Sequence, residues 1–314
     1  MNNLQTVRRT LRRSLSKRKV LSLILSVVRF CFILSICYII LNPLLTKLSI
    51  SFMEHTDIYD PTVKMVPKHF TLNNYADTVQ YLRYFTLLAQ TLVVCTVVTL
   101  TQVLSCTLAG YGFARFHFKG RGPLFACVII MMLIPNCVLI TPQYLNFNEV
   151  GVIGTFIPML LLGLTGTGAR CGLYIFLARQ YFRGIPKEID EAAMIDGAGP
   201  FKVFTSIMLR SAVPTMVTIG LFSFVWQWGE NTYTGMFLSS NWKTLSSALS
   251  NLGYLMQQDG INIGSTVVAM ADYAAYYTAI YATGTILTIV PLILLYVICQ
   301  KFFVESIENS GIVG

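Results

Sequence analysis

The stretch EAAMIDGAG, residues 191–199, lies between two long apolar runs and differs from both in its acids and small residues. Pro186 precedes it at a position that suits a helix start, and acidic residues follow within one turn. Gly197 and the residues up to Pro200 supply the turn geometry that ends a helix. The pattern predicts a short amphipathic helix in a loop between apolar segments.

The predicted helix has a small apolar face. Ile189 and Ala193 are four residues apart and are expected to share that face, and Ala192 and Ile195 extend it. A helix of this length is not stable in water by itself. It therefore needs a surface against which to pack.

A second short helix is expected to follow the first. Phe201, Phe204 and Met208 recur at helical spacing and form one stripe, and Pro214 then opens the next apolar run. The two short helices together make up a loop at residues 179–212.

Two kinds of surface can cover the first helix. Alanines let the backbone of another protein approach closely, and carboxylates at a helix start favour the helix dipole and offer charge pairing. A lipid surface instead favours Lys and Arg on the polar face of the helix. Acids outnumber the single Lys187 here, so a protein partner is the preferred interpretation; the acids are Glu188, Asp190, Glu191 and Asp196.

The composition is that of a membrane protein. Hydrophobic residues make up 54% of the 314 residues and charged residues only 12%, whereas a soluble domain has about 25% charged residues. The net charge of +9 comes from short basic segments beside apolar runs. Such segments are typical of topology signals, and they argue against a nucleic-acid-binding face.

Six stretches are long and apolar enough to span a bilayer as helices, which takes about 20 residues each. The fifth is interrupted near residues 229–231, so its outer boundary is the least defined. The predicted spans are residues 27–49, 85–113, 123–143, 155–179, 213–234 and 276–303.

The basic residues predict the orientation. Residues 1–26 form a basic arm, the 115–122 loop has three Lys or Arg residues, and the 179–212 loop has five. With six spans these segments fall on one side, so both termini are expected in the cytoplasm. The arm is interpreted as uncleaved, since its apolar run is too long for a signal peptide. The external segments are then residues 50–84, 144–154 and 235–275.

Several function classes lack the residues they need. The sequence has no GxxxxGK[ST] phosphate-binding loop, no HExxH pair and no Ser, His and Asp set. The eight cysteines lie in or beside apolar runs without CxxC spacing, which predicts neither a disulfide framework nor a metal site. An ion-driven carrier would need acids inside its spans, and these spans contain essentially none.

One charge inside a span is a candidate for the substrate pathway. Arg170 lies near the middle of the fourth span, where a charge costs about 2.5–3.5 kcal/mol on insertion scales. The glycines and threonines of residues 163–172 weaken that helix, which is tolerated where the backbone faces protein or a cavity. Arg170 either hydrogen-bonds a substrate or pairs with carbonyls of the broken helix.

The end of the fifth span carries flat rings and polar groups that suit sugar stacking. Trp and Tyr are also common at membrane interfaces, so that interpretation stays open beside a role in the pathway. The residues are Trp226, Trp228, Glu230, Asn231 and Tyr233.

The segment GLYIFLARQYFRGIPKEIDEAAMIDGAGPFKVF, residues 172–204, resembles the EAA region of ABC importer permeases of the maltose type. The resemblance extends over nearly the whole chain. HFTLNNYADTV looks like the family's external segment, LAGYGFARFHFKGRG like its second span and loop, and MMLIPNCVLITPQYL like its third. It implies an all-α permease of the type I fold, with residues 27–314 as the six-helix domain.

The resemblance also implies partners. The predicted helix would be a coupling helix seated in a cleft of a cytoplasmic ATPase, with Glu191, Ala192, Ala193 and Gly197 at the matching positions. Glu188 and Asp196 add carboxylates to the expected docking set. A second homologous permease, most often in a heterodimer, and an extracellular solute-binding protein would complete the importer.

The implied function is ATP-dependent sugar import across a prokaryotic cell membrane, without covalent chemistry in this chain. ATP and Mg²⁺ would be used by the partner, and no cofactor is expected here. Import of a non-sugar solute, or a transporter of another class, remains an alternative. The chain departs from the family at Leu209-Arg210, where Leu-Pro is usual, so the angle of the second short helix is uncertain.

Overall fold

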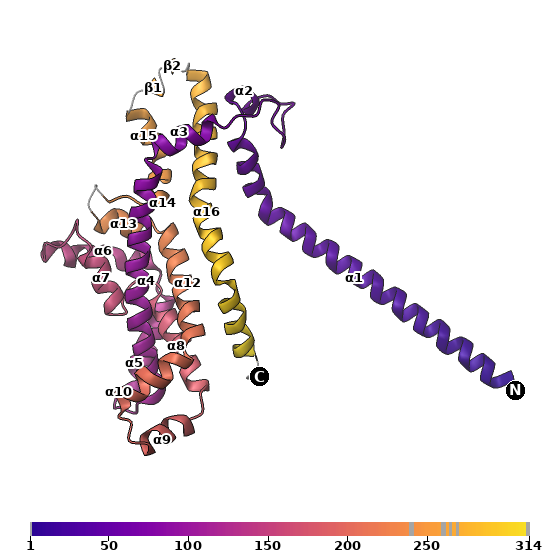
Figure 1. Ribbon diagram of the computed structural model, residues 1–314, viewed down its shortest axis with the longest axis vertical. Helices are drawn as coiled ribbons and strands as arrows, with labels where there is room; N and C mark the ends of the chain where they lie inside the picture. Colours follow the sequence, from indigo (N-terminus) through magenta and orange to yellow (C-terminus); the bar gives the residue numbers. More distant parts are fainter. Residues whose placement is uncertain (1, 239–241, 259–261, 264–265, 268–269, 312–314) are drawn as a thin grey trace.

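The computed structural model describes residues 2–238, 242–258, 262–263, 266–267 and 270–311, and these are nearly all helical. Side-chain burial is described from residue 22 to residue 301, apart from residues 239–241 and 257–272. The molecule is elongated, and most helices run along its long axis (Figure 1).

The first helix stands apart from the others. Helix α1 (Asn2–Ser51) slants away from the bundle and meets it near α16 (Met270–Gly311) (Figure 1). Its apolar part, Ser22–Ser51, leaves side chains such as Leu23 and Phe32 about two-thirds exposed. An apolar surface of this extent is not stable in water. It is suited to lipid or to another apolar protein surface.

The centre of the bundle is the pair α4 (Tyr84–Arg115) and α8 (Cys171–Gly184). Gly110 of α4 lets the backbone of α8 approach closely, because a Cβ atom there would lie 2.5 Å from the Cβ of Ala178. Small residues at a crossing permit this tight packing between membrane helices. Helix α12 (Val213–Gly229) packs against α4, α8 and α16 and completes the central layer.

The expectation of six spans is met only in part. Within the described residues, three helices are long and apolar enough to cross a membrane: Ser22–Ser51, Tyr84–Arg115 and Tyr273–Lys301. Two bent pairs raise that number to five if each pair forms one span. The predicted 27–49, 85–113 and 276–303 spans correspond to the three long helices.

The predicted third span, 123–143, is sharply bent. Helices α5 (Arg121–Leu133) and α6 (Asn136–Glu149) meet at 105°. Ile134 between them is extended, with ψ 127°. The residue before a proline is biased away from the helical region, and Pro135 follows directly. The span predicted over 123–143 is therefore two helices with a bend between them.

The predicted fourth span, 155–179, is two helices. Helix α7 (Ile157–Leu164) ends where the Gly and Thr residues begin, and α8 starts at Cys171. The weakness expected at 163–172 is thus a complete break. The predicted fifth span is shorter than 213–234, because α12 ends at Gly229.

The loop at 179–212 forms one end of the molecule. It contains α9 (Glu188–Ile195), α10 (Pro200–Val203), the π-helical turn η1 (Phe204–Met208) and α11 (Leu209–Ser211). The chain bends by 72° between residues 200–211 and α12. The bend comes at Ala212, so it forms although Arg210 replaces the usual proline.

The opposite end consists of short elements. They are α2 (His55–Ile58), α3 (Asn73–Tyr81), α13 (Thr232–Phe237), α14 (Leu245–Ser250), α15 (Leu252–Gln258), and the antiparallel strands β1 (Asn262–Ile263) and β2 (Thr266–Val267). Parts of the expected 235–275 segment lie outside the described residues. In Figure 1 both chain ends lie toward the end of the molecule that carries α9.

Candidate functional site

Helix α9 forms where its sequence predicts, and its ends explain why. Acids in the first turn suit the positive end of the helix dipole. At the other end Gly197 N–H donates to Met194 O, and Ala198 N–H donates to Ala193 O, both at 3.0 Å. These two bonds are the Schellman pattern, which requires a left-handed residue after the helix. Gly197 supplies it with φ +83°.

The side chains of α9 divide between an inner and an outer face. Ala193 and Asp190 point inward and are 7% and 9% exposed. Ile195 is 86% exposed and Ile189 is 43% exposed. The predicted apolar face of Ile189 and Ala193 is therefore split, because Ala193 packs into the chain's own core.

The predicted docking residues lie mostly on the outer surface. Glu188, Glu191, Ala192, Asp196 and Gly197 are all exposed, whereas Ala193 is not. The stripe predicted for the second short helix also divides. Phe201 is 79% exposed, and Phe204 and Met208 are buried; these three residues were expected on one face.

An ion pair holds α9 against the bundle. Arg115 Nε lies 2.9 Å from Asp190 Oδ2, and Arg115 Nη2 donates to Ile185 O at 2.9 Å. The two side chains are 8% and 12% exposed. Burial raises the pKa of the Asp190 carboxyl, and the charge of Arg115 opposes that effect. From the sequence, Asp190 was identified only as one of the acids in the loop. Its partner Arg115 lies 75 residues earlier in the chain, so no local pattern predicted the ion pair.

A cavity of about 70 Å³ lies in the middle of the bundle. The break before α8 contributes Arg170, the end of α12 contributes Trp226 and Glu230, and α4 contributes Gln102. Asn136, at the start of α6, also lines it. The structure thus brings together three of the predicted pathway residues from two separate spans.

Arg170 holds an unusual conformation at this cavity. Its φ of +65° is in the left-handed region, and it caps the start of α8. Its guanidinium carbon lies 3.1 Å above the centroid of the Trp226 ring, a cation–π contact. Among the described residues the guanidinium has neither an ion pair nor a hydrogen bond, so its pairing with broken-helix carbonyls is not observed.

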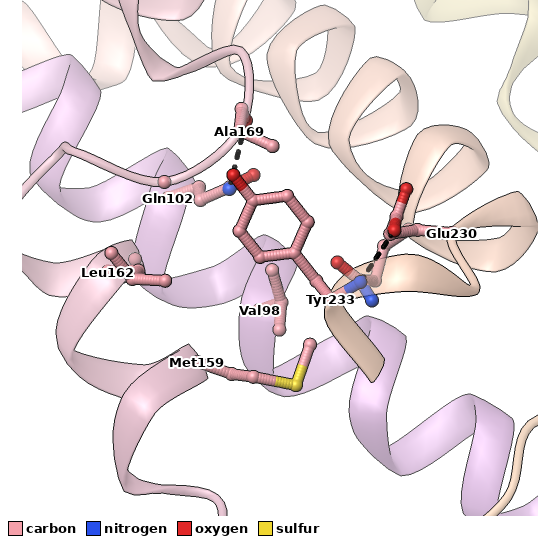
Figure 2. Close-up of a pocket in the computed structure, with 10 residues that line it drawn as sticks. Val98, Gln102, Met159, Leu162, Ala169, Glu230 and Tyr233 are labelled. Atoms are coloured by element: carbon pink, nitrogen blue, oxygen red, sulfur yellow. Dashed lines mark hydrogen bonds between the residues drawn. The ribbon is translucent and has the colours of Figure 1, made fainter. Parts of the chain in front are cut away.

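A second, smaller cavity of about 30 Å³ shares Gln102, Ala169 and Glu230 with the first. Figure 2 shows the ring of Tyr233 extending across it toward Gln102 and Ala169. Glu230 Oε1 accepts the backbone N–H groups of Thr232 and Tyr233, at 2.6 and 2.8 Å. These bonds fix the Glu230 carboxylate beside both cavities.

Gln102 connects three elements around the cavities. Ser223 Oγ of α12 donates to Gln102 Oε1 at 2.6 Å. Gln102 Nε2 donates to Ala169 O at 3.4 Å (Figure 2). The sequence interpretation missed Gln102, Ser223 and Asn136. A glutamine in the middle of an apolar run was the available signal, since polar groups inside spans are costly.

Two predicted pathway residues lie elsewhere. Trp228 is 2% exposed, and its Nε1–H donates to Thr288 O of α16 at 3.1 Å. Asn231 Nδ2 donates to Ser250 Oγ at 2.9 Å. Neither residue lines the two cavities. Their contacts connect α12 and the following segment to α16 and α14.

Helix α8 joins the cavity to α9. Arg170 caps its start, and Ile185 ends it and leads through two residues into α9. Its 14 residues span about 21 Å. A movement of α9 can therefore be transmitted to the cavity through the single helix α8. The cavity itself offers hydrogen-bond donors, acceptors and an aromatic ring, the groups that bind polyhydroxylated molecules.

Comparison with known proteins supports a transport role. The profile of the family described as binding-protein-dependent transport system inner membrane component matches residues 106–309. That match includes α8, α9 and α12. It begins at residue 106, so it leaves out α1 and most of α4.

Curated relatives match over most of their length. The chain is 27% identical to the arabinooligosaccharides transport system permease protein AraQ of Halalkalibacterium halodurans, over 89% of this chain and 93% of AraQ. It is 28% identical to the maltodextrin transport system permease protein MdxG of Bacillus subtilis, over 76% and 78%. It is 26% identical to the diacetylchitobiose uptake system permease protein NgcG of Streptomyces coelicolor, over 87% and 84%.

A solved structure has the same fold. A bacterial ABC transporter involved in the import of the acidic polysaccharide alginate superposes with a TM-score of 0.71 at 19% identity. The superposition covers 89% of this chain and 96% of the other.

Proposed function

The chain belongs to the family of binding-protein-dependent transport system inner membrane components, and we propose that it is the permease subunit of an ATP-driven sugar importer. It is a multi-pass membrane protein, and the proposed location is the cell membrane of a prokaryote. The observation that carries the proposal is the connection of two sites by one helix. Helix α8 begins at the Arg170 cavity and ends beside the exposed helix α9.

Sugars are the proposed substrate class. Three relatives are named for arabinooligosaccharides, maltodextrin and diacetylchitobiose, all of them glycans. The cavity presents a guanidinium, a carboxylate and three side-chain amides, those of Gln102, Asn136 and Gln227, to a ligand rich in hydroxyl groups. Trp226 is 51% exposed, and the guanidinium of Arg170 lies over one face of its ring.

The cavity requires movement before a sugar can pass. Its volume of about 70 Å³ is well below the roughly 300–1,000 Å³ of clefts that hold small-molecule ligands. A sugar therefore passes only when the helices around the cavity separate. A homologous second permease subunit is the proposed partner, and the two chains together would form the full pathway.

A cytoplasmic ATPase is the proposed source of that movement. Ile195 and Phe201 are large apolar side chains exposed at the end of the molecule, and Glu188 and Glu191 are exposed on the same helix as Ile195. A ligand shifts a two-state equilibrium only through its different affinity for the two states. ATP closing the ATPase dimer would pull α9 and tilt α8, opening the cavity outward, and hydrolysis would reset it.

In this proposal the partner ATPase, and not this chain, hydrolyses ATP. This chain acts as a mechanical link and a channel wall, while ATP and Mg²⁺ bind the ATPase. An extracellular solute-binding protein delivers the sugar. Its proposed contact is the end of the molecule with α3 and α14, opposite α9 (Figure 1).

Uptake measurements test the proposal directly. Cells that produce the complete importer would be given ¹⁴C-labelled maltodextrin, arabino-oligosaccharide and diacetylchitobiose. The expected result is ATP-dependent uptake of at least one of them. Arg170→Met should lower that uptake at limiting sugar by at least tenfold while the ATPase still copurifies, because the guanidinium is lost from the cavity.

Arg83→Met is the matched control. Arg83 is also a left-handed arginine at a helix start, with φ +47°, but it does not line either cavity. It should keep uptake within twofold. Normal uptake by the Arg170 variant would remove Arg170 from the pathway, and absence of uptake of every glycan would reject the sugar assignment.

A further inference from the structure

The buried ion pair of Arg115 and Asp190 occupies the point where three helices meet. Arg115 is the last residue of α4, Asp190 lies on α9, and Ile185, whose carbonyl Arg115 also binds, ends α8. One side chain thus contacts the end of α8 and the first turn of α9 at once. The segment between them, residues 185–190, is held at both ends.

The ion pair lies close to a buried cluster that contains aromatic rings. Tyr111, one turn earlier on α4, contacts the ring of Phe182 at 5.2 Å and that of Phe204 at 4.7 Å. These residues belong to one buried cluster that includes Ala193 of α9. Asp190 Oδ1 and Arg115 Nε are both buried without a hydrogen bond, so the two side chains interact through their opposite charges at 2.9 Å.

Helix α4 continues from this pair to the cavity. Gln102 lies 13 residues before Arg115, or about 20 Å along the helix axis. It binds Ser223 of α12 and the carbonyl of Ala169, the residue before Arg170. Gly110 between them packs α4 tightly on α8. The two helices are therefore in contact at the cavity, at their crossing and at α9.

We propose that the Arg115–Asp190 pair is a positioning device that makes α4 and α8 follow α9 as one unit. The proposal rests on the proposed function only in that α9 must be the element that an ATPase moves. Without the pair, α9 would remain attached to α8 only through residues 185–187 and the packing of Ala193. Its displacement would then bend that linker and would reach the cavity weakly.

The test uses the full importer in lipid nanodiscs with its ATPase and solute-binding protein. The measured quantity is the ratio of ATP hydrolysis with and without the solute-binding protein. Arg115→Met and Asp190→Asn should each reduce this stimulation at least tenfold, with basal hydrolysis and ATPase copurification within twofold of the unaltered complex. Lys119→Met, which removes an exposed cation near the same helix end, should leave the stimulation unchanged.

A charge exchange separates positioning from simple loss of structure. The double variant Arg115→Asp with Asp190→Arg restores an ion pair and should recover at least half of the stimulation that either single reversal loses. Full stimulation in Arg115→Met would overturn the proposal. So would loss of ATPase copurification in both neutral variants, or failure of the exchange to restore any stimulation. If the unaltered complex shows no ATPase copurification, the proposed function fails instead.

Discussion

Gly197 offers the sharpest test of how α9 works, because two explanations of this glycine predict opposite rankings of variants. In the first, the backbone conformation matters. Gly197 has φ +83°, and its N–H group and that of Ala198 close the end of α9. In the second, the missing side chain lets a partner approach closely.

The magnitude of the first effect follows from the structure. No atom lies within 4 Å of a Cβ built at Gly197, so substitution creates no clash within this chain. The remaining cost is the left-handed conformation, about 1–2 kcal/mol for an L-residue. Since 1.4 kcal/mol is a factor of ten, the closed end of α9 should become about 5 to 30 times less favoured in Gly197→Ala. Gly197→Val should be worse, because β-branched residues are rare there.

Asparagine separates the two explanations. It adopts the left-handed region more readily than other L-residues, but it is larger than alanine. If conformation decides, stimulation of the ATPase by the solute-binding protein should fall in the order Gly, Asn, Ala, Val. If close approach decides, Ala should retain more activity than Asn. Gly199→Ala is the control, because Gly199 has φ −70° and open space around its Cβ position.

The assay is the same nanodisc measurement, with membrane insertion checked by the yield of full-length protein. If Gly197→Val leaves the stimulation of the ATPase unchanged, the explanation based on backbone conformation is refuted. An equal loss in Gly199→Ala would refute it as well, because that variant carries no strain.

Two further predictions concern packing and pH. Gly110→Ala places a Cβ atom 2.5 Å from that of Ala178 and should destabilise the packing of α4 on α8 by about 1–3 kcal/mol. The measurement is the midpoint of thermal unfolding in detergent, which should fall. Gly112→Ala is the control and should leave the midpoint unchanged, because the space around its Cβ position is open. His69 Nδ1 pairs with Asp57 at 2.8 Å, which raises the pKa of His69 and contributes to lowering that of Asp57. The contribution of His69 to stability is complete below its ordinary pKa of 6.5 and is lost as pH rises through its raised pKa. The contribution of Asp57 to stability is lost as pH falls through its lowered pKa. Hydrogen exchange in residues 52–71 should therefore quicken, beyond its intrinsic dependence on pH, as pH rises from about 6.5 through the raised pKa of His69, and His69→Gln should abolish that excess.

The local signals of α9 were sufficient to predict its position. Pro186, the acids and Gly197 are caps that act on the few residues beside them, so no distant contact is needed to interpret them. The inner face was different. A helix of eight residues takes its orientation from what holds it, and Arg115 lies 75 residues away. The assignment of Ile189 and Ala193 to one face failed for that reason.

Long apolar runs predicted three spans well, and broken ones less well. Hydropathy averages over about 19 residues and does not register a single turn. The break at 165–170 was visible as a cluster of Gly and Thr, and the bend at Ile134-Pro135 was visible as an Ile-Pro pair. Only the first was used, so no bend was predicted in the third span.

The cavity was half predictable. A charge inside a span is conspicuous because it is costly, and this identified Arg170. The partners from α12 were less clear, because successive helical residues are rotated by about 100°. Trp226 and Trp228 are two residues apart and therefore point to different sides, one to the cavity and one to α16. The sequence alone could not decide which.

The conformation of Arg170 adds an argument that the sequence could not supply. Among the described residues only Arg83 and Arg170 have positive φ without being glycine. An L-residue in that region costs about 1–2 kcal/mol, which a glycine would avoid. The same break already contains Gly166 at φ +66° and Gly168, so glycine is readily accommodated there. Strain that a glycine would relieve indicates that the side chain itself has a use. Arg170→Gly should therefore stabilise the break while lowering uptake, and a variant that gains stability without losing uptake would show that the guanidinium is dispensable.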